Sequence, residues 1–211
     1  FWISTSSSKW TPLGTAEYTD AFVGAAYGAD NETYEVKIEK SDDTSGLYRL
    51  VNPYGEAFPY NEDGDWDATR NYYLEINASD PDGVYITVQN TGLNWGDGNF
   101  YVYSEAASYL DNGKTLAEAK SDGICGTLKD GVITFPASSL LFGFFEIDTE
   151  NFYEANTDGA FEIVLPSAVT TNKRNAAISK KFVNKSQVKL AKTPIQKRKV
   201  LVTPSKVTLL K

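Results

Sequence analysis

The stretch that decides the fold is Gly46-Leu47-Tyr48-Arg49-Leu50-Val51-Asn52-Pro53-Tyr54. Its first half is a short apolar strand pattern that contains one arginine. The Asn52-Pro53 pair ends the strand, because proline lacks an amide hydrogen and restricts the residue before it. A long polar loop that holds several aromatic residues follows, from Glu56 to Asn71. The stretch therefore predicts a core β-strand that delivers a loop, and it carries no chemical motif.

The same kind of pattern recurs outward from this stretch in both directions. Thr33–Glu39 alternates apolar and charged residues with a period of two, which is typical of a half-buried strand. Further strands are predicted at 47–51, 71–77, 84–89 (as the hairpin partner of 71–77), 100–103, 124–128, 132–135, 139–147 and 160–165. Asp-Gly or Asn-Gly turns recur at 63–64, 82–83, 97–98, 112–113, 122–123, 130–131 and 158–159.

Short strands with frequent turns predict an all-β protein built as an antiparallel β-sandwich, with barrel closure as the alternative. Leu13–Gly28 is interpreted as a strand followed by a loop or irregular turn. The segment Lys114–Lys120 is the one convincing helical pattern, and we expect it to be a short helical insertion of about two turns.

The charge distribution divides the chain into two parts. Residues 1–166 carry all 28 acidic residues and 8 basic ones, a net charge of −20, whereas residues 167–211 carry 12 basic residues and no acid. We expect an acidic β-sandwich domain over 1–166 and a basic tail over 167–211. The tail mixes Val and Leu with Lys, so it is predicted to form short strands that dock on the body or extend a sheet edge. A nucleic-acid or membrane partner is the less favoured interpretation of the basic charge.

Composition excludes several kinds of chemistry. The chain has no histidine, which removes the usual general base and the usual catalytic triads. Cys125 is the single cysteine, so neither an internal disulfide nor a cysteine-based metal site can form. No apolar run approaches the roughly 18 residues of a transmembrane segment. Because the sequence begins at Phe1 without a signal-like segment, we interpret it as the mature or trimmed form of an exported protein.

Several stretches carry a family resemblance: Leu13–Thr15, Tyr18–Asp20, Tyr34–Ile38, Gly46–Tyr54, Gly131–Pro136 and Ala155–Phe161. Together they resemble a group of all-β surface or secreted lipoproteins from gut Bacteroidetes, largely of unknown function. The resemblance covers most of residues 10–166 and none of the tail. It implies export to the cell envelope and contact with a host or glycan ligand, and it supplies no catalytic residue. A lipid-attachment cysteine of that group would lie upstream of Phe1.

Aromatic residues provide the candidate ligand site. Sugar rings pack on aromatic side chains, so an exposed aromatic strip is typical of a binding surface. We expect a platform formed by Trp66, Trp95 and Tyr101, with Tyr103 on the same strand face as Tyr101. Cross-strand aromatic pairing within the sheet is the structural alternative. Arg49 is a candidate for a ligand carboxylate or hydroxyl, and pairing with an acid on a neighbouring strand is the favoured alternative.

One acidic loop has spacing that suits a hard cation. Asp63, Asp65 and Asp67 occupy every second position, as carboxylates do in calcium loops, although Gly64 is misplaced for an EF-hand. Calcium is therefore a possible cofactor, and a solvated acidic loop is the favoured interpretation. The Asp80–Gly83 and Asn94–Asn99 segments are expected to be turns first and cation sites second.

These observations favour an exported, non-enzymatic cell-surface protein that binds glycan or another surface ligand. The first alternative is a structural or adhesion subunit that uses its basic tail for assembly. The second is a carboxylate-based glycoside hydrolase, since catalysis without histidine would need paired acids. No spacing in the sequence singles out such a pair.

Overall fold

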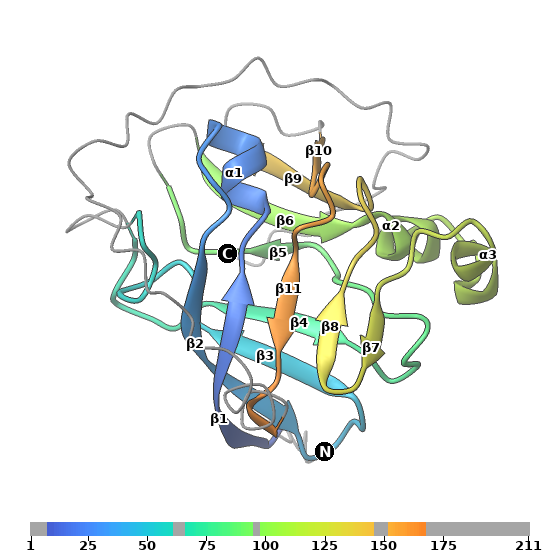
Figure 1. The fold of residues 1–211 in the computed structure, drawn as a ribbon, viewed down its shortest axis with the longest axis horizontal. Coiled ribbons are helices and arrows are strands. Elements are labelled where there is room, and N and C mark those ends of the chain that lie inside the picture. The colour runs from blue at the N-terminus through green and yellow to red at the C-terminus, as the bar shows by residue number, and fades with distance from the viewer. Residues whose placement is uncertain (1–7, 61–65, 95–97, 146–151, 168–211) are drawn as a thin grey trace, which may run out of the picture.

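The computed structural model describes residues 8–60, 66–94, 98–145 and 152–167 (Figure 1). Two antiparallel sheets face each other, so the predicted all-β, sandwich-like class is confirmed. The larger sheet has seven strands in the order β4-β3-β2-β1-β11-β8-β7, and the smaller has four in the order β10-β9-β6-β5. The tail strands predicted for residues 167–211 fall almost entirely outside the described residues.

The larger sheet is curled, with β3 and β4 running across the direction of β1 and β11 (Figure 1). Its strands are β1 (Trp10–Thr19), β2 (Thr33–Ser41), β3 (Leu47–Val51), β4 (Tyr73–Asn77), β7 (Thr127–Lys129), β8 (Val132–Thr134) and β11 (Glu162–Val164). The register between β1 and β2 shifts between Pro12 and Gly14. Gly14 takes a φ of 116°, which a residue with a side chain rarely adopts. A bulge of this kind bends and twists a strand and so contributes to the curl.

The smaller sheet contains β5 (Gln89–Asn90), β6 (Asn99–Ser104), β9 (Leu140–Phe145) and β10 (Tyr153–Ala155). Among the described residues, the named helices are α1 (Phe22–Tyr27), α2 (Glu105–Asp111) and α3 (Leu116–Ser121). α1 follows β1 directly and contacts β9 and β10 (Figure 1). It ends at Gly28, which is left-handed with a φ of 70° and donates its N–H to Gly24 O.

The core lies between the two sheets and is rich in aromatic residues. Tyr18 and Phe161 meet edge-on with ring centroids 5.6 Å apart. Within the smaller sheet, Phe100 of β6 packs on Phe142 and Phe144 of the neighbouring strand β9. Aromatic pairs of this kind contribute about 0.5–1.5 kcal/mol beyond the burial of their area. Leu50, from the stretch that decides the fold, is fully buried in the same core.

Three local predictions differ from the structure. Leu13–Gly28 contains the helix α1 rather than an irregular turn, and α2 was not predicted at all. Residues 84–88 form only isolated bridges, from Tyr85 to Asn77 and from Val84 to Gly126, instead of a full hairpin with β4. Short elements of this kind depend on tertiary packing, since helices shorter than about 12 residues are marginal by themselves.

The predicted helical insertion is confirmed as α3. Thr115 caps it by accepting from Glu118 N, and Glu118 reaches back to the Thr115 N–H at 2.7 Å. This reciprocal capping box satisfies two amide groups that would otherwise lack partners. Lys120 then joins the helix to the Asp80 turn through a 2.7 Å ion pair.

Candidate functional site

Arg49 lies on the outer face of the larger sheet and is fully engaged there. Its guanidinium is stacked between Trp10 and Tyr73, 4.1 Å and 3.8 Å from the two ring centroids. It also pairs with Glu39 on the adjacent strand β2, with a nitrogen–oxygen distance of 2.7 Å. The Arg49 side chain is only 15% exposed. The structural alternative for Arg49 is confirmed, and little of its surface is left for a ligand.

Tyr101 and Tyr103 do not form an exposed strip. They project from β6 away from the main core, as the alternation predicts, but a second small core covers that face. Tyr101 is 9% exposed and Tyr103 is fully buried, packed with Ala107 of α2, Leu141 and Phe152. The expectation that these two rings are an open platform is therefore wrong, because α2 folds back over the strand it follows.

Trp66 is half-buried at the end of the polar loop. It bridges to Leu93 on a segment that is distant in sequence. A Cβ added to Gly55 would lie 3.2 Å from the Trp66 ring. The ring therefore packs directly on the backbone at Gly55, in the segment that follows β3. Trp95, its expected partner, lies outside the described residues.

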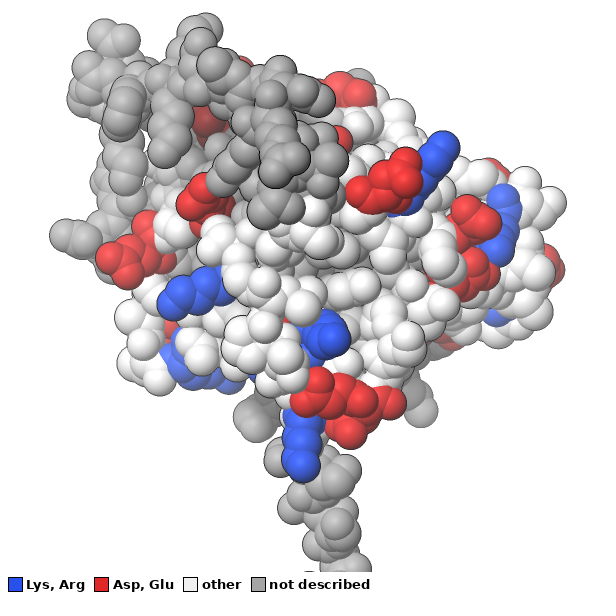
Figure 2. Space-filling view, turned by 60° about the horizontal axis from the view of Figure 1, so that its bottom comes forward, with Lys and Arg blue, Asp and Glu red and all other residues white. Residues whose placement is uncertain are grey.

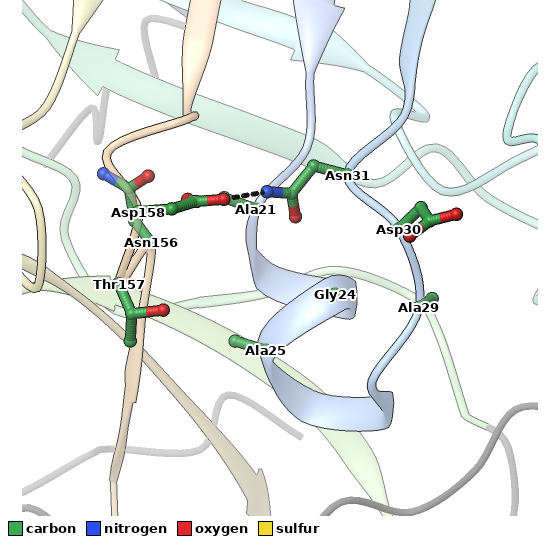
Figure 3. Close-up of a pocket in the computed structure, with 9 residues that line it drawn as sticks. All are labelled: Ala21, Gly24, Ala25, Ala29, Asp30, Asn31, Asn156, Thr157 and Asp158. Atoms are coloured by element: carbon green, nitrogen blue, oxygen red, sulfur yellow. Dashed lines mark hydrogen bonds between the residues drawn. The ribbon is translucent and has the colours of Figure 1, made fainter.

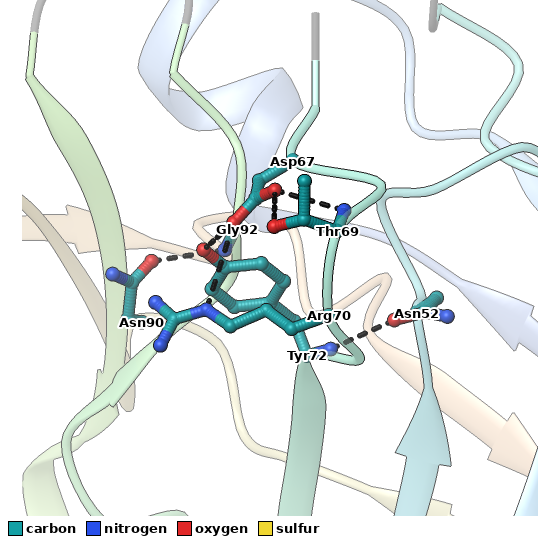
Figure 4. Close-up of polar contacts among 7 residues, drawn as sticks. All are labelled: Asn52, Asp67, Thr69, Arg70, Tyr72, Asn90 and Gly92. Atoms are coloured by element: carbon teal, nitrogen blue, oxygen red, sulfur yellow. Dashed lines mark hydrogen bonds and ion pairs between the residues drawn. The ribbon is translucent and has the colours of Figure 1, made fainter.

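Arg70 and Tyr72 follow Trp66 in the sequence, and the side chains of these two residues lie together (Figure 4). The Arg70 guanidinium lies 4.5 Å from the centre of the Tyr72 ring, and its side chain is 64% exposed. Gly92 packs against the Tyr72 ring and has a φ of 81°; an added Cβ there would lie 2.5 Å from a ring carbon. The ring is thus held between a glycine backbone and an arginine that is open to solvent.

Hydrogen bonds fix the geometry of this loop. Asp67 accepts the Tyr72 hydroxyl at 3.0 Å and also binds the side chain and backbone of Thr69. The two bonds from Thr69 contribute most to lowering the pKa of Asp67 below its usual value, and the bond from Tyr72 adds to the effect. Asn52 accepts from Tyr72 N at 2.7 Å, which ties the loop to the end of β3. We refer to Trp66, Asp67, Arg70, Tyr72 and the neighbouring Asn90 as the Trp66 cluster.

The expected calcium loop is only partly described. Asp63 and Asp65 lie outside the described residues, and Asp67 is occupied by Thr69 and Tyr72 and lies 3.6 Å from Arg70. Within the described ranges, no three His, Cys, Asp or Glu side chains gather closely enough to hold a metal ion. Asp80 of the second acidic turn is likewise used, since it pairs with Lys120.

A shallow pocket of about 290 Å³ lies between α1 and the turn that links β10 to β11 (Figure 3). Its helix side carries only small residues, among them Gly24 and Ala25. Asn31 donates to Asp158 at 2.8 Å across the pocket, and Thr157 offers a hydroxyl from the opposite side. The pocket could accept a small polar group, but its Asn31 amide and Asp158 carboxylate already bind each other.

Asp20 is a fully buried acid beneath the start of α1. It accepts hydrogen bonds from the hydroxyls of Tyr18 and Tyr54 and from Val23 N at 2.9 Å. Burial raises the pKa of Asp20, although these hydrogen bonds oppose the shift. Burial likewise raises the pKa of Tyr18 and of Tyr54 well above the usual value. Asp20 is 3% exposed, so a substrate has no access to it and its role is structural.

One face of the described surface shows acids and bases side by side. In the view that turns the lower end of Figure 1 toward the reader, acidic groups lie close to lysines and arginines around a broad uncharged area (Figure 2).

Within the part of the chain that the structure describes, no helix has the length and apolar character needed to cross a membrane.

Comparison of the chain with family models, curated proteins and solved structures found no match.

The sequence singled out Trp66 but missed Arg70, which lies over the Tyr72 ring. Arg70 stands in a loop, where no periodicity indicates which way a side chain faces. The sequence nevertheless contains a signal for a turn at this point. Asp67 is a turn-forming residue, and its side chain accepts a hydrogen bond from Thr69 N, two residues later.

Proposed function

We propose that the protein is an exported, non-enzymatic binding protein of the cell surface or extracellular space, and that it binds glycan through the Trp66 cluster. The observation that carries the proposal is the open Arg70 guanidinium held over Tyr72, in a segment that also carries the half-buried Trp66. The resemblance to envelope lipoproteins supports export, with a lipid anchor upstream of Phe1 as its implied means of attachment.

The chemistry of the cluster suits a sugar. An indole ring offers an apolar face for the C–H groups of a sugar ring, whereas Arg70 and Asn90 offer groups that bind hydroxyls. The cluster is held in place before any ligand arrives, because Asp67, Asn52 and Gly92 fix Tyr72 from three sides. A preformed site loses less conformational entropy when it binds, which favours affinity.

A carboxylate-based hydrolase is the weaker proposal. Among the described residues, burial raises the pKa of Asp20, and this acid lies inside the core rather than in a cleft. A general acid needs both a raised pKa and access to the scissile bond. The structural or adhesion alternative depends instead on the basic tail, residues 167–211.

The test is a glycan array followed by calorimetric titration of the sugars that bind. We expect Trp66→Ala and Arg70→Ala each to weaken binding about tenfold or more, as a loss of about 1.4 kcal/mol produces. Lys114→Ala is the matched control, because Lys114 also lies over a tyrosine, Tyr109, at 3.9 Å but belongs to another part of the surface. Circular dichroism should show that all three variants keep their fold.

Two results would contradict the proposal. One is the absence of any sugar binding by the full chain on the array and in the calorimeter. The other is binding that survives both cluster substitutions. If Thr157→Trp, which fills the α1 pocket, abolishes that surviving binding, the ligand belongs to the pocket instead of the cluster.

A further inference from the structure

We propose that the glycan bound by the Trp66 cluster is acidic, and that Arg70 and Asn90 bind its anionic group, a carboxylate or a sulfate ester. The proposal rests on the proposed function, because it names the class of sugar for the same site. Its starting point is a pair of hydrogen-bond donors that the fold holds in place and leaves open. These donors are the terminal nitrogens of the Arg70 guanidinium and the side-chain nitrogen of Asn90 (Figure 4).

The Arg70 guanidinium is held on one side and open on the other. Its Nε lies 3.6 Å from Asp67 Oδ2, and its central carbon lies 4.5 Å from the centre of the Tyr72 ring. The two terminal nitrogens point away from Asp67 (Figure 4), and the side chain is 64% exposed. The guanidinium is therefore fixed by Asp67 and Tyr72, while its terminal N–H groups can donate to a ligand.

Asn90 supplies the second donor. Its Oδ1 accepts from Gly92 N at 2.9 Å, so the side-chain nitrogen is the group left to bind a ligand. Gly92 in turn packs on the Tyr72 ring, which carries Arg70. The pKa of Arg70 is raised, first by Tyr72 and less by Asp67 and by Tyr101, the cross-strand partner of Asn90. These contacts bring the guanidinium and the Asn90 amide to the same part of the surface.

The two open groups select an anion. Both of them donate hydrogen bonds, and one of them carries a positive charge. A guanidinium can give two parallel hydrogen bonds to an anionic group, and such charge-assisted bonds are about twice as strong as bonds between neutral groups. A neutral sugar hydroxyl cannot accept both parallel bonds in this way. An acidic sugar therefore uses the donors more fully than a neutral one.

The rest of the sugar has an apolar surface within reach. Trp66 bridges to Leu93, the residue that follows Gly92 in the chain. Tyr72 and Trp66 thus lie against neighbouring residues of one segment. An oligosaccharide whose anionic group binds Arg70 can extend along this segment and place a ring on the indole.

The negative charge of the body does not prevent binding of an anion. Residues 1–166 carry −20, but exposed charges are screened beyond about 8 Å at physiological salt. Asp67 lies within that distance, although it faces Nε of Arg70 and already accepts from Thr69 and Tyr72. The groups that touch the anion therefore determine its affinity.

The test is calorimetric titration of the full chain in two arms at about 0.15 M salt. In the first arm, uronic-acid oligosaccharides are compared with their methyl esters, which keep the ring but lose the charge. In the second arm, sulfated oligosaccharides are compared with the same sugars without sulfate. In at least one arm we expect the acidic sugar to bind about tenfold or more tightly than its neutral counterpart. The arm that shows the preference identifies the anion.

Two substitutions assign the preference to the site. Arg70→Gln removes the guanidinium, and Asn90→Asp keeps an oxygen for Gly92 N but places a carboxylate where the amide donor stood. We expect each variant to reduce the preference for the acidic sugar to about twofold or less. Lys114→Gln is the matched control, because it lowers the net charge by the same amount and removes a cation from Tyr109 elsewhere on the surface. This control should keep the full preference.

The outcomes separate this proposal from glycan binding itself. Binding of neutral and acidic sugars with equal affinity would overturn the acidic preference and leave the proposed function standing. A preference that Arg70→Gln and Asn90→Asp reduce no more than Lys114→Gln does would place the anion elsewhere on the protein. No binding of any sugar would overturn both proposals.

Discussion

At the scale of single residues, Asp20 shows how a polar group can help to organise an apolar core. A buried carboxylate is costly unless hydrogen bonds satisfy it. Two tyrosine hydroxyls and the Val23 amide supply those bonds, and the last of them anchors the start of α1. Asp20 therefore links three parts of the chain: β1 through Tyr18, the segment after β3 through Tyr54, and α1 through Val23. Its ionisation is coupled to the stability of all three.

This coupling predicts a pH dependence with a definite sign. Because the folded-state pKa of Asp20 is raised, its protonated form is favoured in the folded protein. That stabilisation is fully present below the usual pKa of an aspartate and is lost as the pH rises through the raised value. The free energy of unfolding of the wild type minus that of Asp20→Asn should therefore fall with rising pH, by about 1.4 kcal/mol for each unit of upward shift.

The measurement is urea unfolding of both proteins at a series of pH values above 4. The other carboxyl groups titrate equally in the two proteins, so their effect cancels in the difference. A difference that stays constant, or that grows as the pH rises, would show that Asp20 is not destabilised by its burial.

At the scale of elements, Arg49 joins four strands of the larger sheet. It stands on β3, pairs with Glu39 on β2 and stacks between Trp10 of β1 and Tyr73 of β4. A lysine at this position would keep the charge but lose the flat guanidinium that fits between two rings. The arrangement is therefore a structural connection across the curled part of the sheet.

We expect Arg49→Lys to lower the free energy of unfolding by about 1–2 kcal/mol, mainly through the lost stacking. Denaturant unfolding measures the change, and sugar affinity should remain that of the wild type. Unchanged stability combined with weakened sugar binding would reverse the assignment and make Arg49 a ligand-binding residue.

At the scale of the whole molecule, Gln89 connects the two sheets at an edge. Its side chain donates to Glu75 O at 2.8 Å and accepts from Glu75 N at 2.7 Å, so it satisfies the edge of β4 as a further strand would. Gln89 belongs to β5 of the smaller sheet, and this contact therefore closes one side of the sandwich. Uncovered strand edges promote pairing between molecules.

Substitution of Gln89 by alanine should open that edge. We expect a loss of about 1–3 kcal/mol, because two buried or half-buried backbone groups of Glu75 lose their partners. Light scattering over a range of protein concentrations should then detect more self-association than in the wild type. A variant that associates no more than the wild type and is equally stable would show that water replaces the Gln89 contacts without cost.

The sequence by itself determined the all-β class, most strands and the position of α3. Period-two alternation and Asp-Gly turns are local signals, so Thr33–Glu39 and Leu47–Val51 were readable without any partner. The favoured role of Arg49 was also readable, because a charged residue inside an apolar strand must find an opposite charge.

Only the tertiary structure decided which faces stay open and which loops meet. Alternation separates the two faces of β6 but does not say that α2 and Phe152 cover the one carrying Tyr101 and Tyr103. Nor does it bring Arg70 and Tyr72 to the segment that contains Gly92. These contacts join residues far apart in the chain, and their free energy depends on packing between layers, which no local pattern of side chains encodes.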